Sequence, residues 1–172
     1  WSSDVCSSDL TPHSTMTVHT LSVRMRMMGL HEKLDAQFAR HQRALLDRDY
    51  VRAASWLGSY REQLAVHMQD EERYVLPLYQ NHGGDASDAP AKLFLGEHAR
   101  MREFLEKLGD ATAALARQPD DDKLLALLDL EATYKNLLLH HDLRERNALY
   151  PRLEEWASAD ELERLSTSLR SC

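Results

Sequence analysis

The chain has 172 residues, a length that suits one domain with a hydrophobic core of ordinary size. Its net charge of −7 argues against a nucleic-acid-binding protein and against a basic membrane-surface protein, and no run of about 18 apolar residues predicts a membrane span. The two cysteines, Cys6 and Cys172, lie at opposite ends, which excludes a disulfide framework and suits a reducing, cytoplasmic location.

The first residues, WSSDVCSSDL, contain the triplet SSD twice and lack the basic start and apolar core of a secretory signal. They resemble a translated sequencing adapter fused to a reading frame. We therefore expect residues 1–18 to be a disordered or artefactual extension, with the natural start at Met16 or Met25. His13 and His19 are set aside with this extension as polar residues outside the fold.

Apolar residues recur at spacings of three and four from about Leu21 onward, the period of an amphipathic helix. Polar or glycine-rich breaks at 47–49, 81–84 and 118–120 divide the pattern into four segments. No segment shows the strict alternation of a strand.

A fifth, shorter helix is predicted from Ala159 to about Arg170. Ser158 and Glu161 form a capping-box pattern at its start. The sequence therefore predicts an all-α protein: an antiparallel up-down-up-down four-helix bundle over residues 19–157, followed by a short C-terminal helix within residues 158–172.

Each predicted long helix carries one histidine on its apolar face, and these histidines share one height in the bundle. Residues at equal height on neighbouring antiparallel helices are equally far in sequence from the turn between them. The midpoint of His31 and His67 is position 49. The midpoint of His67 and His98 is 82.5, and that of His98 and His141 is 119.5. All three midpoints fall in the predicted turns.

His41 is the alternative to His31 on the first helix. Its midpoint with His67 is position 54, inside a predicted helix, and it lies about 80° round the helix from His31. We rank His41 second and interpret it as a boundary residue near the helix end.

Two carboxylates join the four histidines. Glu71 follows His67 by four positions and Glu145 follows His141 by four, so each pair projects from one helix face. Both pairs belong to a repeated pattern, His-x3-Glu-x5-Pro, and the chain therefore consists of two related helical hairpins.

Burying a glutamate costs free energy unless its carboxylate is paired or coordinated. Four histidines and two glutamates at the same height of the bundle therefore favour a metal site over histidines that are simply hydrogen-bonded in the core. Imidazole and carboxylate ligands without thiolate suit iron, manganese or zinc. Two carboxylates can bridge two metal ions while the histidines fill terminal positions.

These residues resemble the hemerythrin-like, HHE cation-binding family over roughly residues 24–152. The family implies a four-helix bundle around a non-haem di-iron centre, with zinc or manganese as other candidates. By position, the resemblance assigns the metal ligands His31, His67, Glu71, His98, His141 and Glu145. The histidines would be terminal ligands and the two glutamates would bridge the metals.

The chain departs from the oxygen-carrier pattern of that family at two positions. Arg102 replaces the second histidine of a His-x3-His motif that begins at His98, and Glu145 replaces an aspartate. Arg102 either pairs with a bridging carboxylate or extends to solvent. Glu97 and Glu72 are candidates for a substitute ligand, with exposed surface charges as the alternative.

An incomplete histidine set favours exchange and reactivity over stable oxygen carriage. We therefore expect the protein to bind a small diatomic ligand or peroxide and to sense or handle oxygen, nitric oxide or iron. We do not expect it to bind nucleic acid or a membrane. Tyr74 and Tyr134 either hydrogen-bond such a ligand or simply pack. The alternative is a mononuclear or zinc-binding bundle with a regulatory or adaptor role. Ferritin-type chemistry is disfavoured because no candidate histidine follows a glutamate by three positions.

Overall fold

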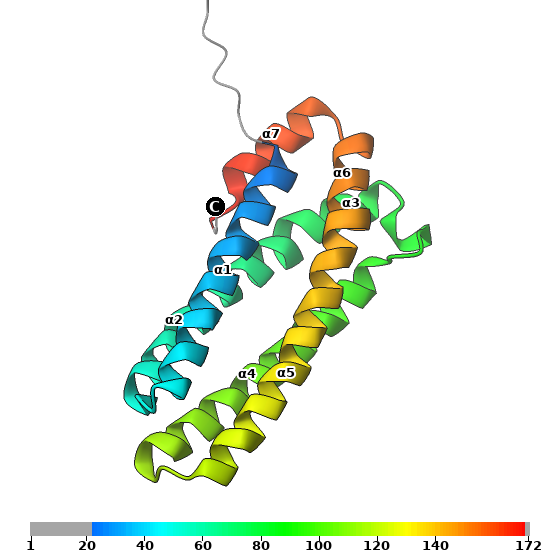
Figure 1. Cartoon of the computed structure of the whole chain (residues 1–172). Helices are drawn as coiled ribbons and strands as arrows, with labels where there is room; N and C mark the ends of the chain where they lie inside the picture. Colours follow the sequence, from blue (N-terminus) through cyan, green and yellow to red (C-terminus); the bar gives the residue numbers. More distant parts are fainter. Residues whose placement is uncertain (1–21, 171–172) are drawn as a thin grey trace, which may run out of the picture.

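The computed structural model describes residues 22–170, and every regular element within that range is a helix (Figure 1). The expected all-α class is confirmed. The predicted extension, residues 1–18, lies outside the described residues, as do the two cysteines. No helix in the described part of the chain is both long and apolar enough to cross a bilayer.

The helices follow the predicted order, and two of the long ones are interrupted by a π-helical segment. In chain order they are α1 (Val23–Leu46), α2 (Tyr50–Asp70), η1 (Glu71–Val75, π), α3 (Leu76–Asn81), η2 (Gly84–Ala86, 3-10), α4 (Ala91–Arg117), α5 (Asp121–Arg144), η3 (Glu145–Leu149, π), α6 (Tyr150–Trp156) and α7 (Ala159–Ser168).

Local sequence signals explain where these helices begin. Ser22, Asp49 and Asp120 each accept a hydrogen bond from the backbone N–H three residues later, at the starts of α1, α2 and α5. The predicted capping box of Ser158 and Glu161 is present at the start of α7.

The three predicted breaks also coincide with observed turns. Arg48 adopts a left-handed conformation with φ of 58° between α1 and α2, and Gly83 has φ of 90° after α3. Gln118 ends α4 in an extended conformation. The chain therefore reverses where the histidine midpoints require it to reverse.

The long helices pack in sequence order, with α1 on α2, α2 on α4, and α4 on α5, while α6 and α7 pack against α1 (Figure 1). Their apolar faces form two separate hydrophobic clusters rather than one. The first contains Phe38, Tyr60 and Tyr134, and the second contains Tyr79 and Phe94. Between the two clusters lies a layer of buried histidines and carboxylates.

Candidate metal centre

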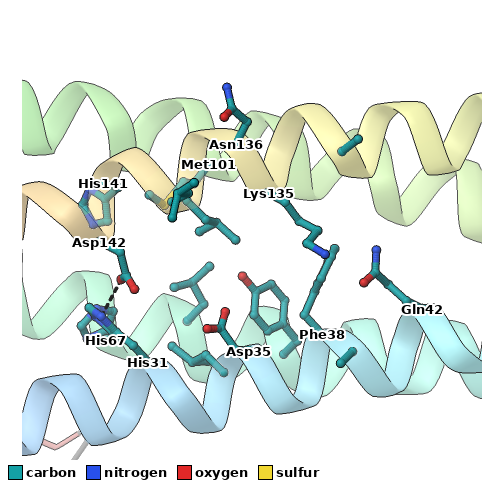
Figure 2. A pocket seen from close by; sticks show the side chains of 17 residues that line it. His31, Asp35, Phe38, Gln42, His67, Met101, Lys135, Asn136, His141 and Asp142 are labelled. Carbon is teal, nitrogen blue, oxygen red and sulfur yellow. Dashed lines mark hydrogen bonds and ion pairs between the residues drawn. The ribbon is translucent and has the colours of Figure 1, made fainter.

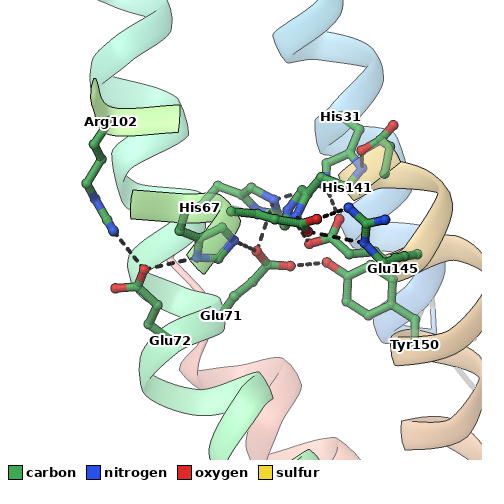
Figure 3. Close-up of polar contacts among 12 residues, drawn as sticks. His31, His67, Glu71, Glu72, Arg102, His141, Glu145 and Tyr150 are labelled. Atoms are coloured by element: carbon green, nitrogen blue, oxygen red, sulfur yellow. Dashed lines mark hydrogen bonds and ion pairs between the residues drawn. The ribbon is translucent and has the colours of Figure 1, made fainter. Parts of the chain in front are cut away.

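The six predicted ligands converge in this polar layer, and all six are buried. Figure 3 shows how His31, His67, Glu71, His141 and Glu145 point toward one another. The described residues form two groups of potential metal ligands, and Glu145 belongs to both. The first group is His31, His67 and Glu145, and the second is Glu71, His98, His141 and Glu145. Within each group the ligand atoms lie within 4.8 Å of one another.

Each hairpin contributes one pair of histidines. The Nε2 atoms of His31 and His67 are 2.9 Å apart, and their rings meet edge to face. The rings of His98 and His141, from the second hairpin, are also edge to face, with centroids 4.9 Å apart.

Each glutamate lies between the two histidine pairs. One oxygen of Glu145 is 2.8 Å from Nε2 of His141, and the other is 3.3 Å from Nε2 of His31. Oε2 of Glu71 is 3.3 Å from Nε2 of His98 and 3.5 Å from Nε2 of His67. Each glutamate therefore contacts histidines of both hairpins.

Both glutamates occupy the first residue of a π-helical segment. The backbone N–H of Leu76 bonds to the carbonyl of Glu71, and the N–H of Tyr150 bonds to that of Glu145, so each turn contains one additional residue. Pro77 and Pro151 follow directly and cannot donate the next helical hydrogen bond. The repeated His-x3-Glu-x5-Pro pattern therefore corresponds to a repeated local structure.

Carboxylates outside the ligand set contact the Nδ1 atoms of three histidines. Asp142 contacts Nδ1 of His31. Nδ1 of His98 is 2.9 Å from Glu72, and Nδ1 of His141 is 2.9 Å from Glu97. Such contacts select the tautomer in which Nε2 presents its lone pair to a metal.

This arrangement changes the interpretation of Glu72 and Glu97. Sequence reasoning offered them as substitute ligands or as exposed charges, whereas the structure places them on the outer nitrogens of His98 and His141. Sequence analysis missed Asp142, although its position next to His141 was a usable signal.

Two arginines extend these contacts outward. Arg102 donates to Glu72 at 2.8 Å (Figure 3). Arg144 bonds to Glu97. The suggestion that Arg102 pairs with a bridging carboxylate is therefore wrong, because its observed partner is the carboxylate that holds His98.

A tyrosine that sequence analysis did not single out reaches the centre. Tyr150, the residue before Pro151, donates its hydroxyl hydrogen bond to Oε1 of Glu71. The hydroxyl of Tyr134 instead lies 2.8 Å from that of Tyr60 in the first hydrophobic cluster, and Tyr74 packs against the second. The packing alternative holds for both Tyr74 and Tyr134.

Electrostatics in the layer differ from group to group. Burial lowers the pKa of His67 to about 4, so this ring is neutral at pH 7. Burial alone raises the pKa of Glu71, but His67 and His98 hold it well below its usual value. Burial and then the charge of Glu71 raise the pKa of Glu145. In the metal-free protein Glu145 is therefore the carboxylate that takes up a proton more readily.

Several polar atoms of the layer form no properly oriented hydrogen bond within the described residues. Oε2 of Glu71, Nε2 of His98 and both carboxylate oxygens of Glu145 are buried without a properly oriented hydrogen bond. Buried polar atoms are normally satisfied. Because these atoms are the imidazole and carboxylate donors that iron, zinc or manganese prefers, the residues fit a bound metal.

His41 lies outside the ligand cluster, as expected from ranking it below His31, but it is not a boundary residue. Its side chain is fully buried, with Nδ1 2.8 Å from the carbonyl of Ala53 and Nε2 2.7 Å from Glu131. Gln42 donates to the second oxygen of Glu131 at 2.8 Å. Sequence analysis did not identify Glu131, which belongs to no spacing motif.

Comparison with known proteins identifies the family. The profile of the Hemerythrin HHE cation binding domain matches residues 25–153. The chain belongs to this hemerythrin family. Its metal-binding domain thus includes both hairpins and all six converging residues, as the resemblance implied.

The hemerythrin-family chain is also similar to a curated protein, the iron-sulfur cluster repair protein YtfE of Cronobacter sakazakii (strain ATCC BAA-894). The two are 28% identical over 105 residues, which is 58% of this chain and 45% of YtfE. The match thus spans less than half of that relative. No solved structure matches the chain.

Proposed function

We propose that this hemerythrin-family protein is a non-haem di-iron protein that senses or handles oxygen, nitric oxide, peroxide or iron, and does not carry oxygen in bulk. The observation that carries the proposal is the position of Glu71 and Glu145, each between histidines of both hairpins. A single metal would need only one of the two ligand groups. Two groups that share a carboxylate favour a dinuclear centre in an antiparallel four-helix bundle.

The proposed ligand roles follow from this geometry. The terminal ligands are His31 and His67 at one position and His98 and His141 at the other, with the glutamates as bridges. When bound, iron supplies redox chemistry and open coordination positions for a small molecule. The chain orients the imidazoles through Asp142, Glu72 and Glu97.

Reactivity rather than carriage is supported by the third long helix, α4. Arg102 stands where the oxygen-carrier pattern has a histidine, and its guanidinium bonds to Glu72, so this position supplies no ligand. The proposed centre therefore has one histidine fewer than a carrier, which leaves a metal position open to exchange.

A role in iron–sulfur cluster repair is the second candidate. It is favoured by the similarity to YtfE, although the match includes only 45% of that protein. Such a role would use the same centre for iron handling. Enzymatic turnover is not required by either candidate.

Metal analysis and the absorption spectrum of aerobically purified protein test the proposal. We expect two irons per chain and near-ultraviolet charge-transfer absorption, both lost in His31→Ala and retained in the matched variant His41→Ala. One equivalent of zinc, or no bound metal, would instead favour the mononuclear or adaptor alternative. Reduced protein exposed to air should oxidise rapidly; a long-lived oxygen adduct would contradict the argument against carriage.

A further inference from the structure

A cavity of about 540 Å³ lies beside the centre, between α1 and α5 (Figure 2). Residues of α1 and α5 form its two walls, and α2 and α4 contribute Tyr60, Leu64, His67 and Met101. Small-molecule sites in proteins typically have volumes of about 300–1,000 Å³. The cavity is therefore large enough for an organic molecule and much larger than a diatomic ligand requires.

The two ends of the cavity differ in chemistry. His31, His67 and His141 line one end, so the candidate centre opens into the cavity. Gln42 and Lys135 lie toward the other end (Figure 2). At about 1.5 Å per residue, the stretch of α1 from His31 to Gln42 is about 16 Å long, which gives the cavity an elongated shape.

Apolar side chains form the middle of the cavity. Leu34 and Phe38 project from α1, and Leu64, Met101 and Leu138 face them from the other three helices. An apolar body of matching length would lose its contact with water on entering this space, which favours binding.

A metal cation bound by the histidines would attract the carboxylate end of such a molecule. Asp142 is already engaged by Nδ1 of His31. At the exposed rim, Asp35 lies near the like charge of Asp142 and near the opposite charges of His31 and Lys135. Glu145 does not line the cavity, but it contacts Nε2 of His31 and of His141 at this end, and its buried oxygens lack a properly oriented hydrogen bond. These are residues of a domain whose family binds metal cations. Cations of that kind bind carboxylate oxygens.

We propose that this cavity binds an organic carboxylate with an extended apolar body, with the carboxylate at the histidine end and the body between α1 and α5. The contact of the head group rests on the proposed function, because it needs the metal. The apolar walls belong to the chain itself and do not depend on which metal is bound.

Titration calorimetry of the metal-loaded protein with straight-chain carboxylates, from acetate to decanoate, tests the proposal. Each added methylene should strengthen binding about three- to fourfold until the cavity is filled. An affinity independent of chain length would overturn the proposal. Lys135→Ala should leave the affinities unchanged, and a large loss in that variant would contradict the orientation of the head group.

Matched variants locate the binding site. Ala39→Phe narrows the cavity two helical turns from His31. It should abolish the increase in affinity with chain length for the longer acids and leave acetate binding intact. Ala111→Phe, which changes a half-buried alanine of α4 outside the cavity, should leave the length dependence intact. If Ala39→Phe does not fold, Ala132→Phe on the exposed α5 wall serves the same purpose. Unchanged decanoate binding in a folded cavity variant would refute the site.

The outcome is separable from that of the proposed function. Iron-containing protein without length-dependent binding would refute only the cavity proposal. Length-dependent binding that Ala39→Phe removes, in protein that binds zinc instead of iron, would refute only the di-iron assignment.

Discussion

Residues 22–170 contain two buried clusters of histidine and glutamate, which differ in how completely their polar atoms are satisfied. In the pair of His41 and Glu131, both ring nitrogens and both carboxylate oxygens have partners within the chain. In the layer around Glu71 and Glu145, three carboxylate oxygens and Nε2 of His98 touch neighbouring groups but have no properly oriented hydrogen bond. The satisfied cluster needs no ligand to explain its burial, whereas the composition of the unsatisfied one fits a bound metal.

The two clusters also differ in symmetry. The metal-centre residues recur in both hairpins, with a π-helical segment at each glutamate. The pair of His41 and Glu131 has no counterpart in the repeat. A duplicated pattern that converges at one height is therefore a stronger indicator of function than burial alone, because His41 is as buried as any of the candidate ligands.

Removal of the metal should produce the largest change. A metal that binds only the folded state, at a free concentration a thousandfold above its Kd, raises the free energy of unfolding by about 4 kcal/mol. Chelation at neutral pH should therefore lower the Tm by about 10 °C, at roughly 2–4 °C per kcal/mol for a chain of this size. Differential scanning calorimetry with and without chelator measures this. A Tm that does not respond to chelation would mean that the layer holds no structural metal.

His41→Ala should destabilise the fold by about 3 kcal/mol, because it leaves Glu131 buried with only Gln42 as a side-chain partner. Its metal content should stay normal. Urea denaturation and metal analysis give the two values. The double variant His41→Leu, Glu131→Leu, which removes both polar groups, should recover most of the lost stability. Loss of metal in His41→Ala would remove the distinction between the clusters.

Glu72→Gln should weaken metal binding about 10- to 100-fold, because it removes the carboxylate that accepts from Nδ1 of His98. The free energy of unfolding of the metal-free protein should change much less. Competition with a chromophoric chelator measures the affinity. Glu103→Gln, on an exposed position of α4, is the matched control and should bind metal normally. Equal affinities in the two variants would show that Glu72 does not orient the ligand.

The smallest effect is expected at a half-buried carboxylate near the surface, Glu161. Hydrogen bonds from Ser158 lower the pKa of Glu161 from 4.5 to about 2. Since the folded-state pKa is depressed, the stabilisation is present above pH 4.5 and disappears as the pH falls toward 2. Glu161→Gln should flatten that part of the pH dependence of the urea midpoint. Glu163→Gln, on an exposed position of the same helix, should leave it unchanged.

Helical periodicity and turn signals determined most of the fold and the height of the centre. Apolar residues from Leu21 onward have the spacing of an amphipathic helix. The breaks near 48, 83 and 119 place four histidines, one on each long helix, at equal sequence distances from the turns between neighbouring helices. Rise per residue in a helix is nearly constant, so sequence separation converts directly into height. For this reason arithmetic on positions separated His31 from His41.

Only the tertiary structure decided which neighbours each side chain meets. Glu71 and Glu72 are adjacent in sequence and about 100° apart round the helix, and one faces the histidine Nε2 atoms while the other holds Nδ1 of His98. Tyr150 on Glu71, Glu131 on His41 and the cavity between α1 and α5 likewise join residues on different helices. Their contacts depend on helix rotation, rotamer and the spacing between helices. These quantities are set by packing across the bundle and leave no periodic trace along the chain.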